Sequence, residues 1–158
     1  MYRQIEANRV TLEKSELIFE GKLEADNRWV VMSKLIPWAE FEEEYAKNFA
    51  ASGMGAPAKS FRIALGSLII KERLGISDRE TVEQIRENPY LQYFLGISKC
   101  SSEAIFEASM LVHFRQRIGE ELVNRINRRM VENTIKESQE KNSEKKLKRT
   151  GKRKIEEN

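Results

Sequence analysis

A short basic stretch in the second half of the chain carries side chains suited to nucleic acid. The candidates for DNA contact in this stretch are Ser109, His113, Arg115, Gln116 and Arg117. Arginine and glutamine can form paired hydrogen bonds with the edges of guanine and adenine. Met110, His113 and Arg117 recur at spacings of three and four, which predicts one side of a helix. An alternative stays open, in which Arg115 and Arg117 pair with neighbouring acids such as Glu120 and Glu121.

Further basic residues follow the stretch. Arg125, Arg128 and Arg129 lie outside the apolar face of the next predicted helix, so we expect them to contact phosphates. Residues 141–158 contain eight Lys and Arg against three Glu, a net charge of +5, whereas residues 1–140 sum to −2. Lys148 and Arg149 in this tail would attract nucleic acid without regard to sequence. The alternative is a solvated, frayed end, because such charged tails are commonly disordered.

Other kinds of site find little support. Ser109 and His113 lie four apart, but no acid follows in a suitable place, so we predict no catalytic residues. The acidic run 42–44 points in several directions around a helix and cannot gather two metal ions. With one Cys and one His, the sequence predicts no metal site, and it indicates no cofactor. Without a signal peptide or an apolar run of spanning length, we expect a cytoplasmic protein that does not enter a membrane.

The elements that must position these residues are helices, and we predict an all-α fold. Residues 1–26 are predicted to form a polar arm, 27–138 a compact helical domain, and 139–158 a disordered basic tail. Asp26 or Asn27 can cap a first helix, and Pro37 can start a second with Trp38, Phe41, Tyr45 and Phe49 along one stripe. Residues 52–57 have the composition of a linker. Ser60 is predicted to cap a broad apolar helix that Gly75 ends.

The second half of the domain is predicted to hold a helix-turn-helix-like element. Ser77 and Glu80 form a capping box, and Asn88-Pro89 ends that helix and starts the aromatic helix of residues 90–95. Its aromatics could stack on single-stranded bases, but their helical spacing beside leucines favours the core. After a loop over 97–108, we expect Ser109 to cap a helix whose inward stripe is Leu111, Phe114 and Ile118. The last helix is predicted to run from about Glu120 to about Lys136 or beyond.

Several ordered motifs resemble a known family. The chain shows Gly55-Ala56-Pro57, then Ile76-Ser77-Asp78-Arg79-Glu80, then an unbroken Glu87–Gly96, and then Ser109–Arg117. Together with Trp29 to Trp38, this order is similar to the N-terminal domain of bacterial and archaeal insertion-sequence transposases of the acidic-triad (DDE) type. The likeness spans about residues 27–135. One departure is Phe106-Glu107-Ala108, where the family often has Phe-Asp-Pro.

The resemblance implies the binding half of a transposase. Family members continue into an RNase H-like domain that binds two metal ions and cuts DNA, and no such pattern follows here. We therefore expect a non-enzymatic, truncated domain that recognises the inverted-repeat ends of an element as double-stranded DNA. We expect a homodimer through the helices of residues 27–50, because the two ends of an element call for two subunits. The alternatives are a helical regulatory module that pairs with full-length transposase, or an inert relic.

Overall fold

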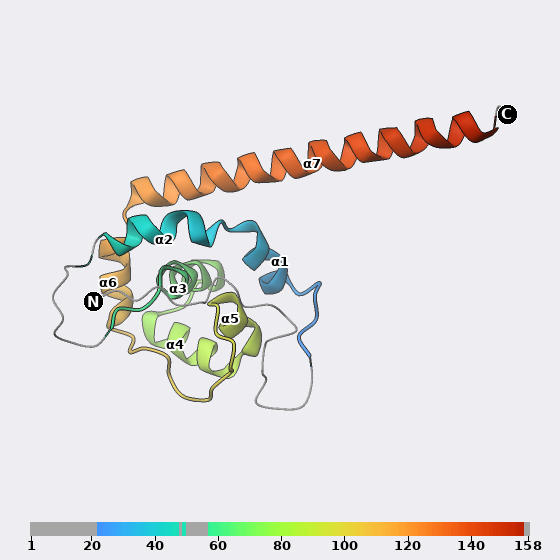
Figure 1. The fold of residues 1–158 in the computed structure, drawn as a ribbon. Coiled ribbons are helices and arrows are strands. Elements are labelled where there is room, and N and C mark those ends of the chain that lie inside the picture. The colour runs from blue at the N-terminus through green and yellow to red at the C-terminus, as the bar shows by residue number, and fades with distance from the viewer. Residues whose placement is uncertain (1–21, 48, 50–56, 157–158) are drawn as a thin grey trace.

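The architecture is helical in the part of the chain that the structure describes. A computed structural model of the protein describes residues 22–47, 49 and 57–156, with side chains described as far as residue 144. Seven α-helices and no strand occur in these ranges, which confirms the predicted all-α class (Figure 1). The helices are α1 (Arg28–Leu35), α2 (Trp38–Ala46), α3 (Phe61–Leu74), α4 (Asp78–Glu87), α5 (Pro89–Phe94), α6 (Met110–Arg117) and α7 (Glu120–Glu156).

Most helices begin where the sequence provides a capping side chain. Asn27 accepts from the Trp29 N–H, and Ser60 from that of Ile63. Ser77 and Asn88 cap α4 and α5 in the same way, so all four predicted starts are confirmed. The predicted side-chain cap of Ser109 on α6 is wrong, because the backbone there is already helical and its hydroxyl makes no capping hydrogen bond.

The centre of the body is α3, around which the shorter helices are arranged (Figure 1). Phe61 at its start is fully buried, and its ring lies 6.5 Å from that of Trp38 and 5.5 Å from that of Tyr45. Trp38 also contacts Phe94 of α5, with ring centroids 5.5 Å apart. Since Phe94 is 0% and Tyr93 4% exposed, the aromatic run belongs to the core, as predicted.

A buried cation connects α3 to α5. Arg62 is only 3% exposed, and its guanidinium donates to the backbone oxygens of Phe94 at 2.8 Å and Tyr93 at 2.9 Å. The same guanidinium lies 5.2 Å from the ring centroid of Trp38. Burial lowers the pKa of Arg62 to about 10, so it remains a cation at neutral pH. One side chain therefore holds α5 against α3 and against the start of α2.

Side chains at the end of α5 also pack closely against α3 at Gly66. A Cβ atom placed on Gly66 would lie 2.6 Å from Cδ2 of Leu95, which is closer than real contacts allow. Leu95 is itself fully buried. The absence of a side chain at Gly66 therefore sets how near the aromatic segment can approach the central helix.

The segment between α5 and α6 is anchored by Gln92, which is 1% exposed. Its Nε2 donates to the backbone oxygens of Ile85, Arg86 and Ser101, and its Oε1 accepts from the Ser101 N–H. The predicted loop over 97–108 is confirmed. This loop is much longer than the turn of three or four residues in a helix-turn-helix. The predicted helix-turn-helix-like element therefore stays a prediction.

The last helix extends well beyond Lys136. Leu122 and Ile126 are buried against the body, but α7 does not end near Lys136 and continues to Glu156. It thus runs through the tail expected to be disordered, and its distal part projects away from the body (Figure 1). The reason is local, because residues 120–150 contain no Gly or Pro and many good helix formers. Within the described ranges, we find no helix whose length and apolar character would suit a bilayer span.

The predicted N-terminal arm is described only from residue 22. In that part Leu23 is 8% exposed and packs with Val30 and Tyr93. The Glu24 N–H donates to the hydroxyl of Tyr90 at 3.1 Å. The end of the arm therefore lies along the body beside α1 and α5. The rest of the arm and residues 52–56 of the predicted linker lie outside the described residues.

Candidate nucleic-acid interface

Helix α6 has one buried and one exposed face. Leu111 and Phe114 are fully buried and Ile118 is 5% exposed, which confirms the predicted inward stripe. The ring of Phe114 lies 5.3 Å from that of Phe106, so the preceding loop also holds the helix. The exposed side chains of the opposite face are the polar His113, Arg115 and Gln116 and the apolar Val112. This helix is thus a fixed support for polar groups that reach solvent.

Arg115 is already engaged in an ion pair across the fold. Its two terminal nitrogens donate to the two carboxylate oxygens of Asp78, at 3.0 and 2.9 Å. Lys71 of α3 lies 3.3 Å from the same carboxylate. The hydrogen bond from Arg115 lowers the pKa of Asp78 below its ordinary value; burial opposes this shift, and Lys71 adds to it. The partner of Arg115 is therefore an acid of α4, and not Glu120 or Glu121.

Arg117 is turned towards the body and is only partly exposed. Its guanidinium lies 4.6 Å from the ring centroid of Phe49. Burial raises the pKa of the Tyr45 hydroxyl, and the nearby guanidinium of Arg117 opposes the shift. Met110, predicted on the same outer side, is partly buried against the core. Arg117 therefore connects α6 to α2. Of Met110, His113 and Arg117, which were predicted to share one side of the helix, only His113 is exposed.

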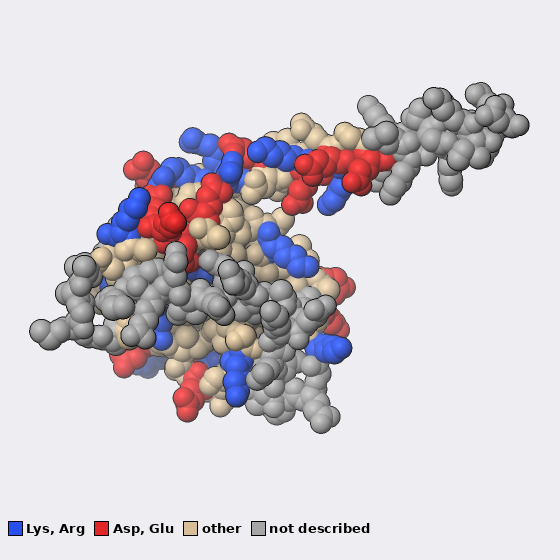
Figure 2. All heavy atoms as spheres, in the orientation of Figure 1, with Lys and Arg blue, Asp and Glu red and all other residues tan. Residues whose placement is uncertain are grey.

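The arginines of α7 lie over the acidic side of α2. Arg125 pairs with Glu44, and Arg129 lies 2.9 Å from Glu40. Figure 2 shows basic and acidic side chains interleaved in this region. Arg128 is exposed, and in the described part of the chain no hydrogen bond or ion pair engages it. Two of these three predicted phosphate contacts therefore already neutralise a neighbouring carboxylate.

The remaining predicted contacts are more scattered. Ser109 is exposed at the start of α6, on the rim of a surface hollow. His113 and Gln116 are exposed on the outer face of the same helix. Lys148 and Arg149 lie outside the residues whose side chains the structure describes. The structure thus leaves Ser109, His113, Arg115 and Gln116 exposed on α6, turns Arg117 towards α2, and places Arg125 and Arg129 over α2.

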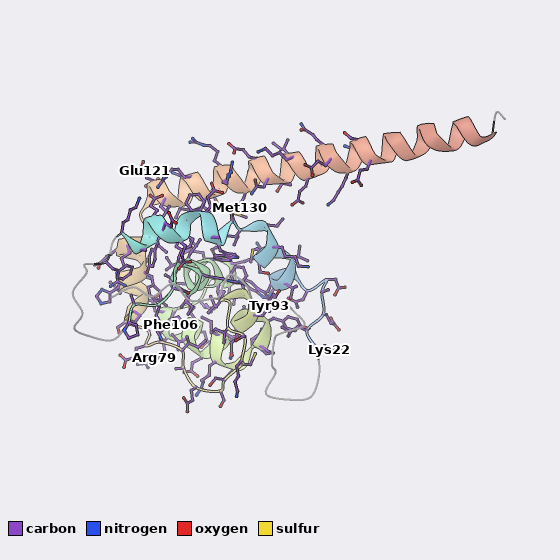
Figure 3. The ribbon with its side chains drawn as sticks, in the orientation of Figure 1. Lys22, Arg79, Tyr93, Phe106, Glu121 and Met130 are labelled. Atoms are coloured by element: carbon purple, nitrogen blue, oxygen red, sulfur yellow. The ribbon has the colours of Figure 1, made fainter. Side chains whose placement is uncertain are left out.

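The hollow beside Ser109 was not expected from the sequence. It is open to solvent and is lined by residues of α3, α4 and α6 and the segments beside them, namely Lys71, Ser77, Asp78, Arg79, Ala108, Ser109 and Arg115. Figure 3 shows Arg79 on the side of the body where Phe106 and α6 lie. The motif Ser77-Asp78-Arg79-Glu80 signals only a capping box when read locally. Through the fold, Asp78 pairs with Arg115, and Arg79 lines the same hollow.

A buried carboxylate gives a prediction about pH. Glu42 is 3% exposed, and burial raises its pKa above the ordinary 4.5, although a hydrogen bond from the Phe61 backbone opposes the shift. The folded protein therefore binds the proton of Glu42 more readily than the unfolded chain does. We expect Glu42→Gln to raise the unfolding free energy at pH 7 by about 1 kcal/mol, or ~2–4 °C in Tm.

The advantage of Glu42→Gln should shrink as pH falls through the raised pKa and vanish below about 4.5, where both chains are neutral at this position. Thermal unfolding of both proteins from pH 4 to 8 measures this. Glu43→Gln, at an exposed neighbour, is the control and should behave like the wild type. A lower Tm for Glu42→Gln at pH 7 would mean that the Glu42 charge stabilises the fold.

Comparison with known proteins gives two matches. Residues 17–117 match the family model described as a transposase domain, DUF772. A Rhizobium meliloti protein described as uncharacterized protein ORF8 in the nfe locus is 37% identical over 90 residues, covering 57% of this chain and 42% of that protein. The match thus spans less than half of that relative's length. No solved structure matches the chain.

Proposed function

Because this chain belongs to the DUF772 transposase domain family, we propose that it is the DNA-binding N-terminal domain of an insertion-sequence transposase. Its substrate would be double-stranded DNA at the inverted-repeat ends of an element. The observation that supports this most is the outer face of α6. That face presents Arg115, Gln116 and His113 from a helix whose other side is fixed in the core.

In this proposal His113 and Gln116 of α6 contact base edges, whereas Arg115 and Arg128 contact phosphates. A helix that reads DNA needs a rigid buried face and an outer face of hydrogen-bond donors, and α6 has both. Arg125 and Arg129 would exchange Glu44 and Glu40 for phosphates, which costs little because exposed ion pairs are weak. The described residues would bind DNA without cutting it. The chain would work where DNA is present, in the cytoplasm of a bacterial or archaeal cell.

Arg115→Ala provides the direct test. If Arg115 contacts a phosphate, its loss should weaken binding to inverted-repeat and shuffled DNA alike by about 1–3 kcal/mol, and should make the salt dependence of binding shallower. Gel-shift titrations with inverted-repeat and shuffled duplexes, at several salt concentrations, measure both effects. Lys99→Ala, at an exposed position in the 97–108 loop, serves as the control for lost charge. Binding that ignores sequence and disappears near physiological salt would reject specific recognition.

A second candidate is a regulatory module that pairs with full-length transposase. Four exposed apolar side chains favour a protein partner, namely Val31 at 44%, Leu35 at 37%, Val131 at 59% and Ile135 at 51% exposure. The aromatic residues of α2, by contrast, are buried, so a dimer through the helices of residues 27–50 could not use them. Analytical ultracentrifugation of the chain, alone and mixed with full-length transposase, distinguishes a monomer, a homodimer and a mixed complex.

A further inference from the structure

The hollow formed by α3, α4 and α6 collects more positive than negative charge. Lys71, Arg79 and Arg115 come from three helices and line it together with a single acid, Asp78. Glu72 lies outside the lining but acts on Arg115 electrostatically. Arg79 is exposed, and in the described residues no hydrogen bond or ion pair holds it. The guanidinium of Arg79 can therefore bind an external anion in this hollow.

Asp78 occupies the position that such an anion would take. Its two oxygens meet the two terminal nitrogens of Arg115 at 3.0 and 2.9 Å, and one of them lies 3.3 Å from Lys71. Phosphate oxygens bind a guanidinium in the same two-pronged way. The hydroxyls of Ser77 and Ser109 line the same hollow and can donate to further oxygens.

We propose that this hollow binds a backbone phosphate of DNA, and that Asp78 is the carboxylate which that phosphate displaces from Arg115. That the phosphate belongs to DNA follows from the proposed function. Without DNA, Asp78 keeps the guanidinium of Arg115 in place beside Lys71. With DNA, the phosphate takes over the two hydrogen bonds, and Arg79 closes on it from the rim. The exchange is feasible because the pair is partly exposed, with 28% of the Asp78 side chain and 42% of the Arg115 side chain accessible.

The proposal predicts opposite effects for two neighbouring residues. Asp78→Asn should tighten DNA binding roughly threefold to tenfold and steepen the salt dependence by about one unit of log–log slope, because Arg115 no longer has a competing carboxylate. Arg79→Ala should weaken binding roughly fivefold to a hundredfold and make the slope shallower by about one unit. Asp78→Glu keeps the charge and should stay close to the wild type.

Gel shifts of the full chain on inverted-repeat DNA measure these changes, with circular dichroism to verify folding. Glu103→Gln, an exposed acid in the 97–108 loop, makes the same charge change elsewhere and should leave affinity within about twofold. A second measurement is a titration with inorganic phosphate, followed by NMR of the arginine Nε–H groups. We expect the Arg79 and Arg115 signals to move, and to move at lower phosphate concentration in Asp78→Asn.

The possible failures are distinguishable. A wild-type chain that binds no DNA but shows the phosphate shifts would reject the proposed function and leave the anion site. A wild type that binds DNA while Asp78→Asn and Arg79→Ala change nothing would reject the hollow alone. Equal tightening by Glu103→Gln would attribute the effect to overall charge and would also reject the displacement. If Asp78→Asn does not fold, Arg79→Ala and the phosphate titration decide the matter.

Discussion

Replacing Arg62 by Met is expected to lower the free energy of unfolding by about 3–5 kcal/mol. The substitution removes two charge-assisted hydrogen bonds, which Arg62 donates to the backbone oxygens of Phe94 and Tyr93. The Phe94 oxygen would then lie in the core without its Arg62 donor. It also removes the cation that lies over the Trp38 ring. Since domains are stable by only about 5–15 kcal/mol in total, this loss is a large share of the stability of the fold.

Urea titration of the purified proteins measures the loss, and Trp29 and Trp38 provide a fluorescence signal from inside the core. Arg73→Met is the matched control, because Arg73 lies on the exposed side of the same helix. That change should stay within about 0.5 kcal/mol of the wild type. A loss of less than 1 kcal/mol for Arg62→Met would show that methionine packing replaces the hydrogen bonds, as happens when some buried ionic groups are substituted by apolar ones.

Gln92→Leu is expected to lower the free energy of unfolding by about 2–4 kcal/mol. Leucine has a similar size, but it makes none of the four hydrogen bonds that Gln92 forms with Ile85, Arg86 and Ser101. The buried carbonyl of Ile85 would lose this donor, and the 97–108 loop would lose its attachment at Ser101. Amide exchange in that loop should therefore accelerate more than exchange in α3.

Hydrogen exchange followed by mass spectrometry, together with urea titration, tests both parts of this expectation. Gln139→Leu changes the same residue type at an exposed position of α7 and should leave both measurements unchanged. Uniform acceleration across the whole chain would indicate global destabilisation, and would contradict a specific role of Gln92 in holding the loop.

The elements that local signals specify could be predicted. The starts of α1, α3, α4 and α5 depend on side chains that bond to N–H groups two or three residues later, so the sequence alone contains both partners. The inward stripe of α6 follows from helical spacing in the same way. The end of α7 could not be placed from the sequence, because its high charge is typical of disordered tails while its residues also favour a helix.

The buried polar groups and the ion pairs could not be predicted, because their partners are distant in the chain. Arg62 is 31 and 32 residues from the carbonyls that it binds. Arg115 and Asp78 are separated by 37 residues, and Arg125 and Glu44 by 81. A local search for partners therefore favoured Glu120 and Glu121, which are near Arg115 in sequence but not its partners in space. The residues that line the candidate phosphate site became apparent only when α3, α4 and α6 were brought together.

The projecting part of α7 sets both how far its C-terminal end reaches from the body and which way that end faces. At a rise of about 1.5 Å per residue, residues 136–156 extend the helix by roughly 30 Å, which is close to the ~34 Å of one turn of duplex DNA. Deleting one residue would shorten this arm by only about 1.5 Å but would rotate its far end by about 100°. Deleting seven would move that end by about 10 Å and return it to within about 20° of its original bearing. The orientation of the far end is therefore far more sensitive to the number of residues than its reach.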